Sequence, residues 1–202
     1  MKLQDDFLAK TTNTPFNIEV EKAEGVYIFD KQGNKYFDLI SGIAVSNLGH
    51  NNLAINDAIK KQVDKYLHVM VFGEYSQTPQ LELAAKLNSI LPEKLTTSYF
   101  VNSGTEANEA ALKLAKRYTG RTEIVSFYKS YHGSTHGSLS VSGNETKKNA
   151  FRPLLPDVRF IHFDNLLDLQ NITKKTACVI VEPIQGDAGV RIPTKVFMEA
   201  LR

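Results

Sequence analysis

The chain has 202 residues, of which 42% are hydrophobic, a composition typical of a globular protein with one large domain or parts of two. Its 24 basic and 22 acidic residues leave a formal net charge of +2, without the basic stripe that nucleic acid or an anionic membrane surface requires. Because the N-terminal residues lack the apolar core of a signal peptide and no apolar run approaches the roughly 20 residues of a membrane span, we expect a cytoplasmic protein.

The first predicted structure is a small antiparallel β-meander at residues 18–39. Apolar and polar residues alternate there around two turn signals, Gly25 and residues 31–34. The alternation predicts these inward positions: Val26, Ile28, Tyr36 and Leu39. Residues 38–50 are rich in Gly, Ser and Asn, and they predict an irregular loop that is able to line a site.

Two helices and a strand are predicted next. Apolar residues recur at helical spacing between residues 53 and 70, and Thr78 followed by Pro79 is typical of a helix start. The apolar face of this second helix would be Leu81, Ala84, Ala85, Leu87 and Leu91. The β-prone segment 98–101 then predicts a strand.

The helix that follows this strand has the clearest boundaries in the chain. Ser103 and Glu106 fit a capping box, and Gly120 stands where a helix C-terminus favours a left-handed residue. Glu109 and Lys113 are spaced for an ion pair on its surface. The predicted apolar face consists of Ala107, Ala110, Ala111, Leu114 and Tyr118.

The turn before this helix has the composition of a phosphate site. Its Ser-Gly-Thr sequence, residues 103–105, leaves backbone N–H groups and two hydroxyls at the positive end of the helix dipole. An ordinary capped helix is the alternative.

The second half of the chain predicts a parallel sheet. Strands are expected in three apolar runs, residues 123–127, 158–163 and 176–181, with a short helix at 166–171. Cys178 lies in the third run, where it would pack as a small hydrophobe and has no partner for a disulfide. Strands of this character, separated by helices, indicate an α/β fold with a mostly parallel sheet covered on both faces.

Polar segments follow three of the predicted strands. Because ligands bind outside the carboxyl ends of parallel strands, these segments are expected to converge on one crevice: residues 103–105, 131–133 and 182–187. The chain ends in a helix that starts at Pro193 and Thr194. We expect its apolar side chains to lack a partner within the chain, as at an interruption inside a domain; they are Phe197, Met198 and Leu201.

Several motifs occur in one order along the chain: DLISGIAVSNLGH at 38–50, TPQLELAAKL at 78–87, NSGTEANEAALKLAKRYTG at 102–120, YHG at 131–133 and EPIQGDAG at 182–189. In this order they resemble the class III, ornithine/acetylornithine-type, pyridoxal-phosphate aminotransferases. The resemblance implies a fold-type I α/β architecture with an incomplete, mostly parallel sheet. It also implies that residues 1–50 belong to the small domain and that residues 51–202 begin the large cofactor-binding domain.

The resemblance implies pyridoxal 5'-phosphate as the cofactor. The implied cofactor-binding residues are Ser103, Gly104, Thr105, Tyr131, His132 and Glu182. In the resembling family, Gly104 and Thr105 hold the phosphate, the aromatic before His-Gly stacks on the pyridine, and Glu182 belongs to the hydrogen-bond network around the ring. The alternatives are a packed tyrosine beside a satisfied histidine, and a capping or ion-paired glutamate.

Three positions near the implied substrate pocket differ from the best-known family members. Ser134 stands where the acetylornithine type has an arginine that binds the substrate carboxylate, and Ile43 stands where the ornithine type has a tyrosine. Asp187 occupies the place of a glutamate that pairs with a distant arginine, and it has a shorter side chain. We therefore expect a preference for another amine donor.

The Schiff-base lysine and the aspartate that faces the pyridine nitrogen lie, in the resembling family, beyond the position of Arg202. None of the lysines here is nominated for that role, because those on helix faces, and Lys147 and Lys148 in loops, lack an apolar setting that would lower the pKa. No metal site is expected, since the histidines lack ligand spacing.

The predicted function is therefore that of a transaminase, which moves an amino group from an amine or amino acid to a 2-oxo acid. We expect a homodimer when the protein is complete, no nucleic-acid or membrane partner, and an inactive 202-residue chain. One alternative is another reaction on the same cofactor, an aminomutase or decarboxylase. The other is a non-catalytic phosphate-binding fragment, although no G-x-G-x-x-G or P-loop motif follows a predicted strand.

Overall fold

The structure is a computed structural model that describes residues 7–70 and 73–202. The chain divides into two compact units, Met1–Leu81 and Glu82–Arg202, and the boundary falls within helix α4 (Thr78–Ile90). Within the described ranges, every helix is too short or too polar to cross a membrane.

The first unit contains the predicted meander. Strands β1 (Val20–Glu24), β2 (Tyr27–Asp30) and β3 (Lys35–Phe37) pair antiparallel in that order. Asp30 forms the second turn, because its carboxylate accepts hydrogen bonds from Asn34 N at 2.8 Å and Tyr36 Oη at 2.9 Å.

The predicted inward positions of the meander are largely wrong. Val26 and Tyr36 are exposed and Leu39 is 83% exposed, whereas Ile28 is half-buried. The buried side chain in these strands is Asp30. The reason is that the strands are short and, among the described residues of this unit, no second layer covers them.

Residues 38–50 form the predicted irregular segment. The short element α2 (Ser41–Ala44) is a left-handed turn, with φ of 50° at Ser41, 61° at Gly42, 65° at Ile43 and 60° at Ala44. Non-glycine residues rarely adopt this conformation, so the segment carries backbone strain. Asp38 supports it, since one carboxylate oxygen accepts Ser41 N at 2.9 Å and the other contacts His50 Nε2 at 2.7 Å.

Helix α3 (Leu53–Val63) and helix α4 are the two predicted helices of this part. Asn52 caps α3 by accepting Ala54 N at 3.1 Å. Neither helix buries a side chain completely, and of the apolar face predicted for α4 only Ala84 and Leu87 are half-buried. Leu81, for example, is 60% exposed.

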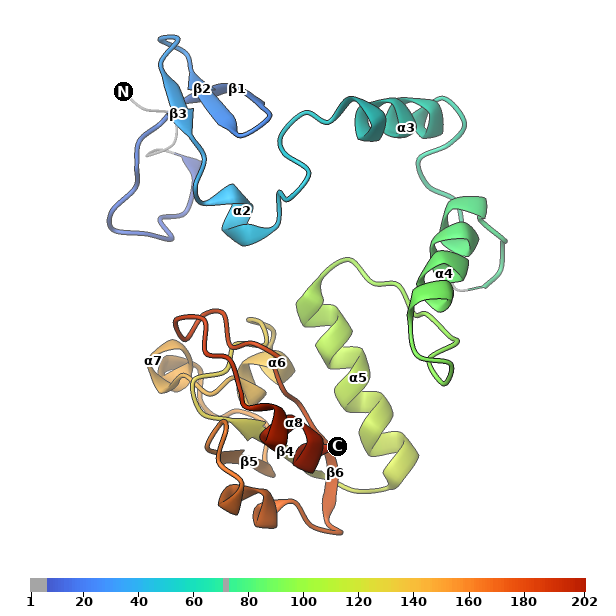
Figure 1. Cartoon of the computed structure of the whole chain (residues 1–202), viewed down its shortest axis with the longest axis vertical. Coiled ribbons are helices and arrows are strands. Elements are labelled where there is room, and N and C mark those ends of the chain that lie inside the picture. Colours follow the sequence, from blue (N-terminus) through green and yellow to red (C-terminus); the bar gives the residue numbers. More distant parts are fainter. Residues whose placement is uncertain (1–6, 71–72) are drawn as a thin grey trace. The chain divides into compact units, whose positions relative to one another are not determined.

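The second unit contains the predicted parallel sheet (Figure 1). Its strands are β4 (Glu123–Phe127), β5 (Val158–Ile161) and β6 (Thr176–Val179), in the spatial order β5-β4-β6. The helical elements around it are α5 (Gly104–Thr119), α6 (His136–Val141), α7 (Glu145–Lys148), η1 (Asn149–Phe151), η2 (Leu167–Asn171) and α8 (Lys195–Leu201).

Alternation along β4 separates two cores. Ile124 packs with Leu112 of α5 and Val141 of α6 on one face. Val125 and Phe127 face the other side, where they pack with a second set of apolar residues, Ile161, Phe163 and Phe197. The sheet is therefore covered on both faces, as predicted.

The terminal helix α8 is part of this second core, so the expectation that its apolar face lacks a partner is wrong. Phe197 is completely buried and meets Phe127 and Phe163 edge to face, at centroid distances of 5.9 and 5.8 Å. Met198 and Leu201 pack beside it. The partners come from two strand ends, which the sequence could not bring together in advance.

Two other expectations in this unit are corrected. Residues 98–101 form no strand, because a strand needs a hydrogen-bonded neighbour and no described strand pairs with them. The predicted apolar face of α5 is largely exposed, with Leu114 at 67% and Tyr118 at 88%, while the buried face is centred on Leu112.

Candidate functional site

The first turn of α5 has free hydrogen-bond donors. Ser103 is the N-cap, and its Oγ accepts Glu106 N at 3.3 Å. Glu106 reaches back to Asn102 N at 2.7 Å, one residue earlier than an ideal capping box would place it. Among the described residues, neither Gly104 N nor Thr105 N has a protein acceptor, and the space around the Gly104 Cα is open. These amides remain free for an anion at the positive end of the helix.

The loop that follows β4 is bonded to both other candidate segments. Tyr131 N donates to Glu182 Oε2 at 3.0 Å, and Thr135 N donates to Thr105 Oγ1 at 3.3 Å. His132 O also accepts Asn108 Nδ2 of α5 at 2.6 Å. Burial raises the pKa of the Glu182 carboxyl above its usual value, against the opposing effect of the Tyr131 N–H bond. The predicted convergence of the three polar segments is therefore present in the structure.

His132 is buried beneath this loop. Only 7% of it is exposed, and its backbone N–H donates to Ser142 Oγ at 2.9 Å. Its ring Nε2 has no partner among the described residues. Burial lowers the pKa of His132 to about 4, so the imidazole is neutral at physiological pH. Its predicted role in cofactor binding stays a prediction.

Tyr131 borders a hollow of about 420 Å³ that Ser134, His136 and Lys147 also line. Lys147 Nζ lies 4.8 Å from the centroid of the Tyr131 ring and binds both carboxylate oxygens of Asp187, at 2.8 and 2.7 Å. Ser134 Oγ is 3.4 Å from the Tyr131 hydroxyl. Asp187 thus has a cationic partner within the same unit, supplied by α7.

Ile43 is the one predicted site residue in the other unit. It is 85% exposed and lies in the left-handed turn of α2. Its predicted role near the substrate stays a prediction.

Several residues that hold the site together were not predicted from the sequence. Glu109 Oε1 accepts hydrogen bonds from Thr135 Oγ1 at 2.5 Å and from Ser138 N at 3.0 Å. It forms no direct ion pair with Lys113 among the described residues, although the Lys113 ammonium contributes to lowering the pKa of the Glu109 carboxyl. A tertiary partner was not recognised because Glu109 stands 26 residues from Thr135, and helical spacing reports only local pairs.

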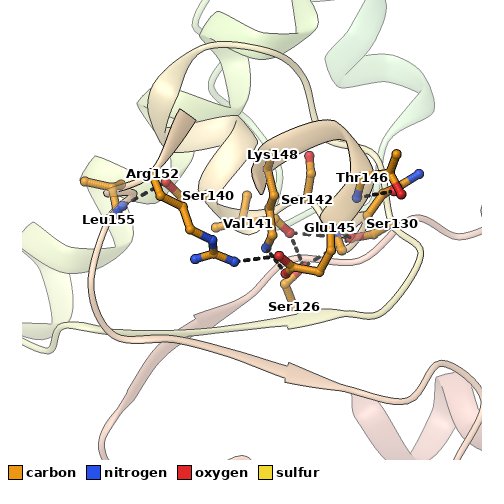
Figure 2. A network of polar contacts seen from close by, with 12 residues as sticks. Ser126, Ser130, Ser140, Val141, Ser142, Glu145, Thr146, Lys148, Arg152 and Leu155 are labelled. Atoms are coloured by element: carbon orange, nitrogen blue, oxygen red, sulfur yellow. Dashed lines mark hydrogen bonds and ion pairs between the residues drawn. The ribbon is translucent and has the colours of Figure 1, made fainter. Parts of the chain in front are cut away.

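Lys148 also differs from its predicted setting. It is only 2% exposed, its Nζ lies 3.9 Å from the Phe160 ring centroid, and it pairs with Glu145 at 3.2 Å. Burial lowers the pKa of Lys148, although the Glu145 carboxylate opposes this effect. Figure 2 shows this pair beside α6, where Ser126 Oγ donates to Val141 O at 2.5 Å. The expectation that Lys148 has no apolar surroundings is therefore wrong.

Comparison with known proteins gives consistent matches. The family model described as Aminotransferase class-III matches residues 8–202. The chain is 42% identical over 186 residues to the LysW-aminoadipate semialdehyde/glutamate semialdehyde transaminase of Sulfurisphaera tokodaii, a match that covers 92% of this chain and 47% of that protein. It is 41% identical over 191 residues to the acetylornithine aminotransferase of Archaeoglobus fulgidus, covering 94% and 50%.

Solved structures give the same result. The adenosylmethionine-8-amino-7-oxononanoate aminotransferase of Methanocaldococcus jannaschii matches with a TM-score of 0.90 and 32% identity, over 98% of this chain and 50% of that one. The taurine:2-oxoglutarate aminotransferase of Bifidobacterium kashiwanohense, solved with PLP and glutamate, matches with a TM-score of 0.88 and 27% identity, over 98% and 50%. The chain thus spans about half the length of these relatives.

Proposed function

The chain belongs to the class-III aminotransferase family, and we propose that its protein moves an amino group from an amine or amino acid to a 2-oxo acid. The proposed cofactor is pyridoxal 5'-phosphate. The observation that carries the proposal is the meeting of three segments: the free N-terminal amides of α5, residues 128–135 between β4 and α6 (the Tyr131 loop), and Glu182 bonded to Tyr131 N.

The residues present fit the phosphate of this cofactor. Gly104 N and Thr105 N are unpaired donors among the described residues, and the Ser103 hydroxyl retains its proton because its oxygen is the acceptor for Glu106 N. Gly104 has open space at its Cα, so a ligand can approach the backbone closely. Three donors at a helix N-terminus support binding of a dianion.

The residues also fit an aromatic ring beside the phosphate. Tyr131 is 43% exposed and borders the hollow, with Lys147 4.8 Å from its ring centroid, so part of the ring is accessible to a ligand ring. When bound, pyridoxal phosphate supplies an electron-accepting ring that carries the amino group between two substrates. Burial raises the pKa of the Glu182 carboxyl above its usual value, and the Tyr131 N–H fixes its orientation.

We further propose that Ser134, Lys147 and Asp187 face the substrates. The Lys147 ammonium is a cation for a substrate carboxylate, and the Asp187 carboxylate is an anion for a substrate ammonium. In the ion pair that they form with each other, both charges are kept partly neutralised until a charged substrate replaces one partner. This arrangement supports a donor preference different from that expected with an arginine at position 134.

The wider predictions remain proposals as well. They are a small domain that includes residues 1–50, a large domain that begins at residue 51, a cytoplasmic homodimer, and a cofactor-binding lysine that the described residues do not provide.

The test is a transamination assay on the full-length protein, with acetylornithine, ornithine, 4-aminobutyrate and simple ω-amines as donors and 2-oxoglutarate and pyruvate as acceptors. We expect activity that depends on added pyridoxal phosphate. We also expect that kcat/KM for acetylornithine does not exceed that of the other donors by about 100-fold, a ratio equivalent to roughly 2.7 kcal/mol. The matched variant Ser134→Arg should raise the relative rate with acetylornithine. Absence of amino transfer with every pair would contradict the proposed activity, and a dominant acetylornithine rate would contradict the specificity.

A further inference from the structure

Helix α5 and the Tyr131 loop fit together through two side chains and two glycines. Thr105 and Glu109 lie one turn apart on α5, and Gly133 and Gly137 are also four residues apart. A Cβ at Gly133 would collide with the Thr105 side chain, and a Cβ at Gly137 would collide with the Glu109 carboxylate. The two glycines therefore allow α5 to approach the backbone of residues 133–137 closely.

We infer that Glu109 is a positioning residue for the Tyr131 ring. It acts through a hydrogen-bonded chain that includes Thr135 and Thr105. This inference rests on the proposed cofactor site. Glu109 accepts Thr135 Oγ1 and Ser138 N, and Thr135 Oγ1 also lies 2.7 Å from Thr105 Oγ1. The same carboxylate therefore supports the start of α6 and holds the end of the loop.

The start of α6 needs this support from outside its own sequence. Its N-cap, Thr135, makes no side-chain hydrogen bond to the first turn, because its hydroxyl is turned toward α5. Glu109 supplies the missing acceptor for Ser138 N, and it places a negative charge at the positive end of α6. These hydrogen bonds keep the pKa of Glu109 low despite the opposing effect of burial, so it is ionised.

The direction of each proton follows from the chemistry of the chain. An ionised carboxylate only accepts, so the single Thr135 hydroxyl proton goes to Glu109. The Thr105 hydroxyl must then be the donor in its bond with Thr135. Because Thr105 Oγ1 also accepts Thr135 N at 3.3 Å, this hydroxyl is engaged within the protein. The donors left for a phosphate are Ser103 Oγ, Gly104 N and Thr105 N.

Two further hydrogen bonds link α5 to the residues on either side of this loop's centre. Asn108 Nδ2 holds His132 O at 2.6 Å, directly after Tyr131, and Ser138 Oγ donates to Thr105 O at 3.0 Å. Loss of the Glu109 carboxylate would loosen the far end of the loop, which would then depend on the bonds of Thr135 and Ser138 to Thr105, while Asn108 and Glu182 hold the near end. The Tyr131 ring would then lose its fixed position relative to the α5 amides, whereas the amides themselves would stay in place.

The test compares two ligands of the cofactor-free, full-length protein: pyridoxal phosphate, which needs both the amides and the ring, and inorganic phosphate, which needs the amides alone. In Glu109→Ala we expect the Kd for pyridoxal phosphate to rise about tenfold, as for loss of a hydrogen bond to a charged group, and the Kd for phosphate to stay within about twofold. Glu109→Gln should lie between Ala and wild type, because its amide oxygen still accepts Ser138 N. Thr135→Val should repeat the selective loss.

Controls separate this effect from unfolding and from loss of the site. Ala is a strong helix former, so α5 should persist in Glu109→Ala, and Glu199→Gln on the exposed side of α8 controls for the change of charge. If Glu109→Ala fails to fold, the Gln and Thr135→Val variants carry the test. Equal weakening of both ligands, or of neither, overturns the inference. Failure of the wild-type protein to bind pyridoxal phosphate overturns the proposed function instead.

Discussion

At the residue scale, three groups contact different parts of Tyr131. Its backbone N–H binds Glu182, its ring faces the Lys147 ammonium, and its hydroxyl reaches Ser134 at 3.4 Å. The bond to the Glu182 carboxyl is 3.0 Å long and the hydroxyl contact is 3.4 Å, so the backbone is fixed more firmly than the hydroxyl. The ring is thus the part of Tyr131 whose removal should matter most.

We expect Tyr131→Ala to weaken binding of pyridoxal phosphate several-fold or more, since ring stacking contributes about 1 kcal/mol beyond area burial. Tyr131→Phe should be nearly neutral, because it removes only the weak contact with Ser134. Titration of the cofactor-free protein, followed by absorbance, measures both. Equal affinities for the two variants would show that the ring does not stack on the cofactor.

His132 makes stability depend on pH. Its pKa is lowered by burial from 6.5 to about 4, so between these values the unfolded state binds a proton that the folded state excludes. Stability is therefore complete above pH 6.5 and falls as the pH decreases toward 4, by about 3 kcal/mol. Urea unfolding at pH 7, 6, 5 and 4 tests this.

The control for His132 is a second histidine with a different environment. His68 is exposed, and His68→Gln is expected to keep the wild-type dependence on pH. His132→Gln should show a shallower loss of stability below pH 6.5. The same slope in both variants would mean that other groups dominate acid unfolding.

At the scale of the elements, local signals and tertiary contacts differ in what the sequence reveals. The start of α5 at Ser103 and its end at Gly120, with φ of 67°, were predictable because capping is a local property. The packed face of α5 was not, since Thr105, Asn108 and Glu109 bind a loop that lies 24 or more residues away. Polar side chains that pack against another segment resemble solvent-facing residues in a hydrophobic pattern.

Helix α8 offers a quantitative test of the second core. Phe197→Ala should lower the free energy of unfolding by about 3–5 kcal/mol, because a completely buried aromatic ring leaves a cavity. Val196 on the same helix is 59% exposed, so Val196→Ala should cost less than about 0.5 kcal/mol. Denaturant unfolding of the two variants measures both values. A loss below 1 kcal/mol for Phe197→Ala would contradict the packing described for α8.

At the scale of the whole molecule, the predicted parallel sheet and the order of elements were confirmed except for the strand expected at residues 98–101, because apolar runs and strand-helix alternation are visible in the sequence. The convergence of three polar segments followed from the same topology. What the topology could not supply is which side chains join them. The bonds that do so, such as Tyr131 N to Glu182, connect residues 51 positions apart and depend on loop conformations without a periodic signal.

The lysines of the 202-residue chain allow a last test of the proposed site. A cofactor-binding lysine needs a lowered pKa and an amine that a carbonyl carbon can reach. Lys148 meets the first condition but not the second: its side chain is 3% exposed and its Nζ is held between Glu145 and the Phe160 ring. Lys147 is more accessible, and its Nζ is bound by both oxygens of Asp187.

We therefore predict that treatment of the 202-residue chain with pyridoxal phosphate and borohydride labels no single lysine stoichiometrically. Peptide mapping should find only low labelling, spread over several exposed lysines. The control is Lys148→Arg, which keeps the charge near Glu145 and should leave the pattern unchanged. One equivalent of label at one lysine, abolished by replacement of that lysine, would show that the chain already contains the residue that binds the cofactor. The 202-residue chain would then provide a cofactor-binding lysine that the surroundings of Lys147 and Lys148 do not indicate.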